Sequence, residues 1–99
     1  MSTSRFFIAT DHPALPGHFP GRPVVPGVVL LDRVAAAVER ETGMRVAALA
    51  QVKFSAPLLP GIEAELRIEE KSKKLHFRIL HKAATLASGI VETAAKAEA

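Results

Sequence analysis

One helical pattern, from Pro26 to Gly43, constrains the fold of this 99-residue chain more than any other feature. Proline is favoured in the first turn of a helix, Ala, Leu, Glu and Arg favour its interior, and glycine is typical of its C-terminal stop. We therefore predict a helix of about 16 residues, roughly 24 Å long. Its first half is apolar on nearly every side, at Val28, Val29, Leu30, Leu31 and Val34. Such a helix is expected to be buried, so the remaining chain must surround it.

The remaining chain carries the two-residue alternation of strands. Residues 5–10 are a β-branched and aromatic run that ends at Asp-His-Pro, and they predict a first strand. Beyond Gly43, four further strands joined mainly by short turns are predicted within residues 44–94. Their expected core-facing residues are Val46, Ala48, Ala50, Val52, Phe54, Ile62, Ala64, Leu66, Ile68, Leu75, Phe77 and Ile79. This order predicts an α+β fold, with an antiparallel sheet of about five strands wrapped around the helix.

The length of the chain predicts one domain, residues 1–99, without room for a second core. A domain this small often gains stability by association, so an oligomer is expected. The chain has no cysteine, which excludes disulfides, thiolate metal sites and cysteine nucleophiles. We also predict no membrane span and no signal peptide, since the longest apolar runs are too short for either. A cytoplasmic location follows as an expectation.

The charge pattern argues against nucleic-acid binding. Thirteen Lys and Arg residues against ten Asp and Glu residues give a formal charge of +3, scattered along the chain. The densest run, Lys71 to Lys74, lies between two predicted strands and is interpreted as an exposed hairpin tip. Basic residues do not alternate with aromatic ones, so we predict no nucleic-acid partner. The positive excess fits an acidic macromolecular partner better.

The segment between the first strand and the helix is rich in proline and glycine and is predicted to be a stiff, ordered loop. It contains His18, with Pro16 and Gly17 before it and Pro20 and Gly21 after it. A lone histidine is usually structural or exposed. A rigid backbone on both sides is instead typical of a preorganised catalytic group.

Asp32 is the second candidate, because aspartate is a poor residue for a helix interior and burial of a carboxylate is costly. One interpretation pairs Asp32 with Arg33 or Arg22, or places it in water at an interface. The other gives it a pKa raised by apolar surroundings, so that it can donate a proton. Nearby, the first-turn amides of Gly27 and Val28 suit an oxygen that gains negative charge. A base, an acid and an oxyanion site together predict proton abstraction and loss of a β-hydroxyl group from a carbonyl compound.

The stretch HFPGRPVVPGVVLLD, residues 18–32, resembles the signature of the β-hydroxyacyl-acyl carrier protein dehydratases of bacterial fatty-acid synthesis, the FabA/FabZ type. The stretch VKFSAPLLPG, residues 52–61, is similar to the family's second segment, a Lys-Phe strand that ends in a Pro-Gly turn. The resemblance implies the hotdog fold, in which an antiparallel sheet wraps around a long central helix.

The resemblance also implies roles for individual residues. His18 is the base that removes the proton at C2 of a 3-hydroxyacyl thioester, and Asp32 protonates or orients the departing C3 hydroxyl. The Val28 amide, with Gly27, polarises the thioester carbonyl. The Val24 carbonyl orients the His18 ring, and Phe19 packs to hold it.

The family's partners and assembly follow from the same resemblance. The substrate arrives on acyl carrier protein. Arg22, Arg33 and Lys53 are candidates to contact its phosphopantetheine or acidic surface, and the alternative for each is a simple solvated charge. His18 and Asp32 of one site come from different subunits, so a homodimer, or a larger oligomer built from dimers, is expected. No cofactor and no metal are implied, and His12, His76 and His81 are given no catalytic role.

Three departures from the family pattern are visible. The acid is Asp, as in the isomerising branch and the short accessory dehydratases of the aryl-polyene (ApeI-like) type, whereas the commonest branch has Glu. Ala36 stands where many members have glutamine, and the chain is shorter than the usual member. Two alternatives stay open: a hotdog thioesterase in which Asp32 activates water, and a non-catalytic acyl-binding subunit that supports an active partner.

Overall fold

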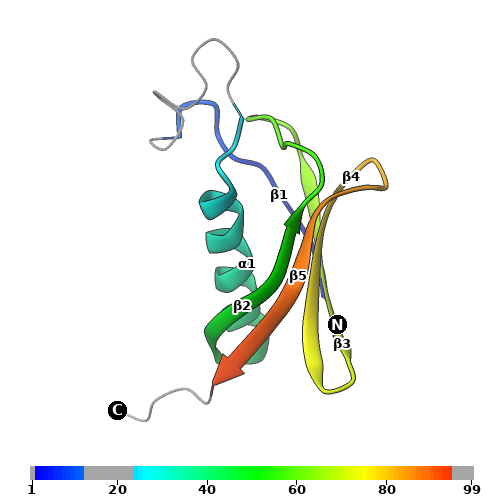
Figure 1. Ribbon diagram of the computed structural model, residues 1–99. Coiled ribbons are helices and arrows are strands. Elements are labelled where there is room, and N and C mark those ends of the chain that lie inside the picture. Colours follow the sequence, from blue (N-terminus) through cyan, green and yellow to red (C-terminus); the bar gives the residue numbers. More distant parts are fainter. Residues whose placement is uncertain (1, 13–23, 95–99) are drawn as a thin grey trace.

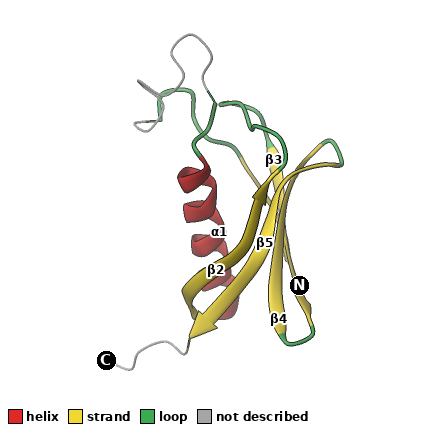
Figure 2. Ribbon diagram, viewed as in Figure 1, coloured by secondary structure: helices red, strands yellow, loops and turns green. Residues whose placement is uncertain are grey.

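The computed structural model describes residues 2–12 and 24–94. Its elements, in chain order, are β1 (Ser2–Phe6), α1 (Gly27–Thr42), β2 (Arg45–Phe54), β3 (Ala64–Lys71), β4 (Lys74–His81) and β5 (Ala84–Ala94). The five strands of the described chain form one antiparallel sheet in the order β1-β3-β4-β5-β2. α1 lies along one face of this sheet (Figures 1 and 2). The prediction of one helix against a five-stranded antiparallel sheet is confirmed. We call the sheet face turned away from α1 the outer face.

The ends of α1 lie where the sequence predicts them. Pro26 is extended (φ −60°, ψ 143°) and directly precedes the helix, which has 16 residues. Gly43 ends it in the left-handed conformation (φ 71°), and its amide donates a hydrogen bond to the Glu39 carbonyl at 2.9 Å. The helix residues buried in the structure share one side, at Val29, Leu30, Val34, Ala37 and Val38. The long helix that the resemblance implies is not confirmed.

The first half of α1 was expected to be buried on nearly every side, and in this chain that expectation is wrong. Val28 is 63% exposed, and Asp32, one turn further on, is exposed as well. The physical reason is the two-layer arrangement, in which a helix packed on one sheet turns only one side toward it. The opposite side of α1 therefore faces solvent.

The alternation predicted for the middle strands is confirmed. Ala64, Leu66 and Ile68 of β3 and Phe77 and Ile79 of β4 are all nearly inaccessible and pack into the core under α1. Leu75 is half-buried and packs against the same core. Ile62 is the exception, since it precedes β3 and is partly exposed.

Both hairpins of the β3-β4-β5 meander close with two-residue turns. Ser72 and Lys73 have positive φ angles of 51° and 64°, and Lys82 and Ala83 have 49° and 69°. Positive φ at both central residues is the type I′ geometry, which matches the right-handed twist of the flanking strands. The interpretation of Lys71 to Lys74 as an exposed hairpin tip is confirmed.

The single core face predicted for β2 is wrong in part. Irregular pairing interrupts the register between β2 and β5 at two points. Each such bulge inserts a residue and shifts the side chains that follow to the other face. As a result Leu49 packs against the core with Val46 and Val52, whereas Ala48 and Phe54 are exposed.

The first strand is shorter and earlier than predicted. β1 pairs with β3 from Ser2, opposite Ile68, to Phe6, opposite Ala64. Because β3 begins at Ala64, residues 7–10 have no strand beside them and leave the sheet, although Ile8 is completely buried. A β-favouring composition sets the type of element, and the partner strand sets its length.

Candidate functional site

Three connecting stretches meet at the end of the molecule where α1 begins: residues 7–12, residues 24–26 and residues 55–61 (Figure 1). The Val25 amide donates a hydrogen bond to the Leu58 carbonyl at 2.9 Å, and the Gly61 amide donates one to the Ile8 carbonyl at 2.8 Å. The side chains of Val25, Leu58 and Ile8 are buried. These contacts fix the backbone that leads into the first turn of the helix.

A cavity of about 430 Å³ opens beside that first turn. Its walls come from the helix start and from the chain after β2, and they include Val24, Gly27, Leu30, Phe54 and Leu58. The lining is mostly hydrophobic, which suits an acyl chain or another apolar group. Two of the residues predicted for the site, Val24 and Gly27, thus line one cavity.

The first turn of α1 presents donors to this cavity. No side chain caps the helix, and the residue before it is Pro26, which has no amide hydrogen. The Val29 amide donates to the Pro26 carbonyl at 3.0 Å, but among the described residues no acceptor meets the amides of Gly27 and Val28. Such unpaired amides at the positive end of a helix stabilise a developing oxyanion.

Phe54 also lies at the site, although the sequence analysis assigned it no role there beyond its place in the segment 52–61. A Cβ atom on Gly27 would lie 2.7 Å from the Phe54 Cζ atom, so the ring packs directly on the glycine. The ring is half exposed and also lines the cavity. The available signal was the position of Phe54 at the end of the predicted strand, directly before the Ser-Ala-Pro turn.

Asp32 lies outside this cavity in the single chain. It shares an exposed stripe of α1 with Val28 one turn before it and Ala36 one turn after it. The expected pairing with Arg33 is absent from the ion pairs of the described residues. Arg33 instead lies over the ring of Phe6, 5.9 Å from its centroid. Asp32 is exposed to water in the single chain, and the alternative pairing with Arg22 falls outside the described residues.

Part of the predicted site lies outside the described residues. His18, Phe19 and Arg22 fall within residues 13–23, so the structure does not test their predicted roles. His12 is described, and its amide donates to the Ala9 carbonyl at 3.0 Å.

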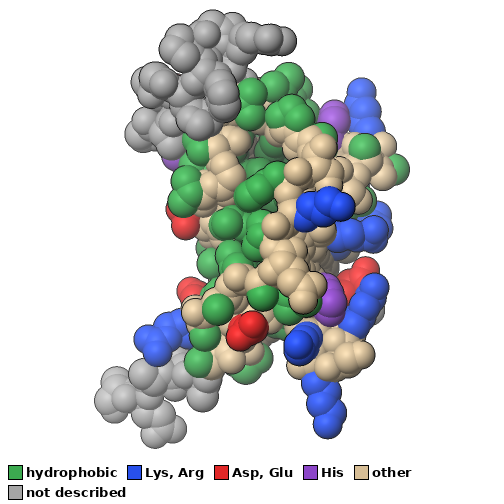
Figure 3. Space-filling model, in the orientation of Figure 1, with side chains coloured by type: hydrophobic (Ala, Val, Ile, Leu, Met, Phe, Trp, Pro, Cys, Tyr) green, Lys and Arg blue, Asp and Glu red, His purple; other side chains and the backbone are tan. Residues whose placement is uncertain are grey.

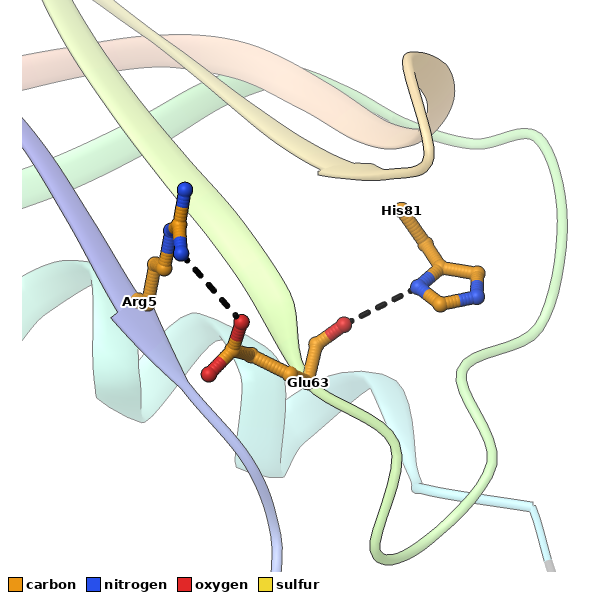
Figure 4. A network of polar contacts seen from close by, with 3 residues as sticks. All are labelled: Arg5, Glu63 and His81. Carbon is orange, nitrogen blue, oxygen red and sulfur yellow. Dashed lines mark hydrogen bonds and ion pairs between the residues drawn. The ribbon is translucent and has the colours of Figure 1, made fainter.

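The other two histidines lie on β4. The His81 Nδ1 atom is 2.9 Å from the Glu63 carbonyl oxygen, and the Glu63 carboxylate pairs with Arg5 at 3.7 Å (Figure 4). These contacts tie the end of β4 to β1 through the chain before β3. His76 pairs with Glu69 of β3 in the sheet register. Within the described ranges no group of three or more His, Asp or Glu side chains is arranged to hold a metal ion.

Comparison with solved structures defines the fold class. The chain superposes on the dehydratase heterocomplex ApeI:P from Xenorhabdus doucetiae with a TM-score of 0.79 and 27% identity, covering 92% of this chain and 84% of that one. It also superposes on an uncharacterized protein from Erwinia carotovora subsp. atroseptica with a TM-score of 0.76 and 27% identity, covering 94% and 82% of the two chains. A sheet packed around one helix, with these neighbours, defines a protein of the hotdog fold.

The family follows from the sequence comparisons. The family model ApeI-like, described as ApeI dehydratase, matches residues 2–90. This chain therefore belongs to the ApeI-like dehydratase family. It is 32% identical over 77 residues to the 3-hydroxyacyl-[acyl-carrier-protein] dehydratase FabZ of Haemophilus influenzae, covering 68% of this chain and 52% of the relative. The corresponding protein of Anaeromyxobacter sp. is 30% identical over 80 residues, covering 68% and 51%. The chain thus spans about half the length of these curated relatives.

One further finding concerns membranes. In the part of the chain that the structure describes, α1 falls short of the length and apolar character needed to cross a bilayer.

Proposed function

We propose that this protein is a hydro-lyase that removes water from a 3-hydroxyacyl thioester carried by acyl carrier protein and forms the trans-2-enoyl thioester. The observation that carries the proposal is the apolar cavity at the start of α1, beside the amides of Gly27 and Val28, which meet no acceptor among residues 2–12 and 24–94. The cavity suits the acyl chain, and the amides suit the thioester carbonyl. The similarity to FabZ relatives, which are 3-hydroxyacyl-[acyl-carrier-protein] dehydratases, supports the substrate class.

The proposed reaction uses two side chains and the backbone amides at the start of α1. His18 takes the proton from C2, and the electron pair of that C–H bond forms the C2–C3 double bond. The C3–O bond breaks, and the leaving hydroxyl receives a proton either from Asp32 or, where Asp32 only orients the hydroxyl, from His18, so that water departs. The Val28 amide, with Gly27, stabilises the negative charge that builds on the thioester oxygen. These steps need an acid, a base and hydrogen-bond donors, and they call for no cofactor.

We further propose that the working unit is a homodimer, alone or within a larger oligomer, and that each site combines His18 of one subunit with Asp32 of the other. The exposed stripe of Val28, Asp32 and Ala36 supports this arrangement, because a largely exposed valine next to a carboxylate suits a surface that a second subunit covers. Val24 and Phe19 are proposed to orient and hold the His18 ring. A cytoplasmic place in fatty-acid or polyene-type biosynthesis agrees with the carrier-bound substrate.

The first experiment measures enoyl product and free thiol from 3-hydroxyacyl-carrier protein substrates of several chain lengths. The variants are His18→Ala and Asp32→Asn, and Glu41→Gln serves as the control because it also neutralises an exposed carboxylate of α1. Wild type and Glu41→Gln are expected to form the enoyl product, and the other two variants to lose at least a hundredfold in rate. Release of free thiol without enoyl product identifies a thioesterase instead. No turnover by a folded oligomer identifies a non-catalytic subunit.

A second experiment tests the shared site by mixing the two inactive variants. In a hybrid dimer one site has lost both groups, whereas the other keeps His18 from one subunit and Asp32 from its partner. Random exchange at equal concentrations should restore about a quarter of the wild-type activity. If both groups of a site come from the same subunit, every hybrid site lacks one group and mixing restores nothing.

A further inference from the structure

The outer face of the sheet carries a row of cations that the proposed reaction does not use. Three register pairs connect the strands. Arg67 of β3 faces Arg78 of β4, and Arg78 also faces Ser88 of β5. Ser88 faces Lys53 of β2 on its other side. Facing residues of antiparallel strands project from the same face. The chain neighbours of Arg67 and Arg78 are buried in the core, so both arginines belong to the outer face. We call Lys53, Arg67 and Arg78, together with the neutral Ser88 between Arg78 and Lys53, the cation row.

The view of the whole surface agrees with this placement. Most of the visible Lys and Arg side chains lie on the side of the molecule that carries β3 and β4, whereas hydrophobic side chains are exposed on the side of α1 and β2 (Figure 3). Arg67 and Arg78 lie on β3 and β4, on the sheet face turned away from α1.

The positive charge of the cation row is only partly balanced. Like charges directly opposite each other on neighbouring strands destabilise a sheet, and Arg67 and Arg78 are such a pair. Arg67 is paired with Glu65, but in the described ranges neither Arg78 nor Lys53 takes part in an ion pair. A bound anion between the two guanidinium groups would remove this repulsion.

The same face is hollowed around the two arginines. A cavity of about 240 Å³ is lined by Arg67, Arg78 and Ser88 of the cation row and by Gln51, His76 and Ile90. The single carboxylate in its wall, Glu69, is already paired with Lys71, which also lines the cavity. The cavity therefore combines two guanidinium groups, a hydroxyl and an amide with a small apolar wall.

Gln51 is brought to this cavity by an unusual backbone. It has a φ of 52°, a left-handed conformation that residues other than glycine rarely adopt, within the irregular pairing between Ala50 and Lys53. Bulges of this kind redirect a side chain and are over-represented near functional sites. Here the bulge places a side chain with two amide hydrogens against the cavity that contains the arginines.

We propose that this cavity binds a phosphate group. Arg67 and Arg78 donate to the phosphate oxygens from neighbouring strands, and Ser88 and Gln51 donate from β5 and β2. Arginine suits this role better than lysine, because its planar fork donates two parallel hydrogen bonds to one phosphate. A concave cavity of this size fits a phosphate alone or a small phosphate ester, and Ile90 would contact the organic part of an ester.

The test measures thermal unfolding of the full chain with inorganic phosphate and with phenyl phosphate, against sodium chloride of equal ionic strength. The salt control is essential because screening alone weakens the repulsion between the arginines. The variants are Arg78→Gln and, as a control, Arg45→Gln, which removes an exposed arginine of β2 outside the cavity. A ligand that binds only the folded state raises the melting temperature with its concentration.

Both phosphate compounds are expected to raise the melting temperature of wild type and Arg45→Gln beyond the effect of salt. Arg78→Gln should melt higher than wild type without phosphate, since the repulsion is gone, and should lose at least tenfold in phosphate affinity. Tighter binding of phenyl phosphate identifies an ester as the ligand, and equal binding identifies free phosphate. No rise beyond the salt effect in wild type, or equal responses of Arg78→Gln and Arg45→Gln, overturns the proposal.

Discussion

Gly27 and Gly89 are each packed against a phenylalanine ring that leaves no room for a Cβ atom. Replacing each glycine with alanine should show whether the ring in contact with it can move aside. A Cβ atom at Gly89 would lie 2.6 Å from the Phe77 Cε2 atom and 3.3 Å from the Ala50 carbonyl oxygen. A Cβ atom at Gly27 would lie 2.7 Å from the Phe54 Cζ atom. Phe77 is 1% exposed and packed in the core, whereas Phe54 is 50% exposed and can rotate outward.

The expected magnitudes follow from this difference. Overpacking a buried site costs about 1–3 kcal/mol, and removing a glycine from a strand interior returns about 0.5–1 kcal/mol. Gly89→Ala should therefore lower the free energy of unfolding by about 1–2 kcal/mol, or the melting temperature by roughly 4–16 °C. At Gly27, better helix propensity of up to about 1 kcal/mol offsets the lost contact with the ring, so the change should stay within about 1 kcal/mol of zero.

The assay is urea unfolding of both variants, together with Gly89→Ala combined with Phe77→Leu. The smaller side chain makes room for the new methyl group, so the two substitutions should be coupled: the double variant loses less stability than the sum of the single variants. Equal losses for Gly27→Ala and Gly89→Ala would refute the reasoning, and so would strict additivity in the double variant.

Three further outcomes are expected from urea unfolding. Gly43→Ala should cost about 1 kcal/mol through its left-handed backbone alone, because a Cβ atom there meets nothing within 4 Å, and Gly43→Asn should cost clearly less. Val34→Ala, in the core, should cost about 1.5–3 kcal/mol, whereas Val28→Ala, on the exposed side of α1, should be nearly neutral in the isolated subunit; equal costs would contradict the packing described here. Glu39→Gln should cost about 0.5–1 kcal/mol by weakening the bond that its carboxylate accepts from the Val46 amide at 3.1 Å, with an unchanged stability as the contrary result.

Features that depend on neighbouring residues in the chain could be predicted from the sequence. The helix bounds are of this kind, because Pro26 cannot continue a helix backward and Gly43 ends it with its own backbone conformation. The alternation in β3 and β4 is also local, since a period of two assigns each side chain to a face.

Features that depend on contacts distant in the sequence could not be predicted. The irregular register of β2 arises from its pairing with β5, and the sequence of neither strand by itself predicts it. The contact between Phe54 and Gly27 requires the end of a strand to pass over the start of the helix. The exposure of Asp32 could not be predicted from the apolar residues around it either. Those residues do not show whether the helix is covered on one side or on both.

The strand order has a consequence for the time course of synthesis. β1 pairs only with β3, so Ser2 to Phe6 must wait for residues 64–68 before it gains a hydrogen-bonded neighbour. α1 and β2 also leave the ribosome before β5, the strand beside which β2 lies. The meander of β3, β4 and β5, by contrast, needs only local contacts and can form quickly. The nascent chain therefore carries an apolar helix without its complete sheet until β3, β4 and β5 have been synthesised, and in that interval a chaperone would protect it most.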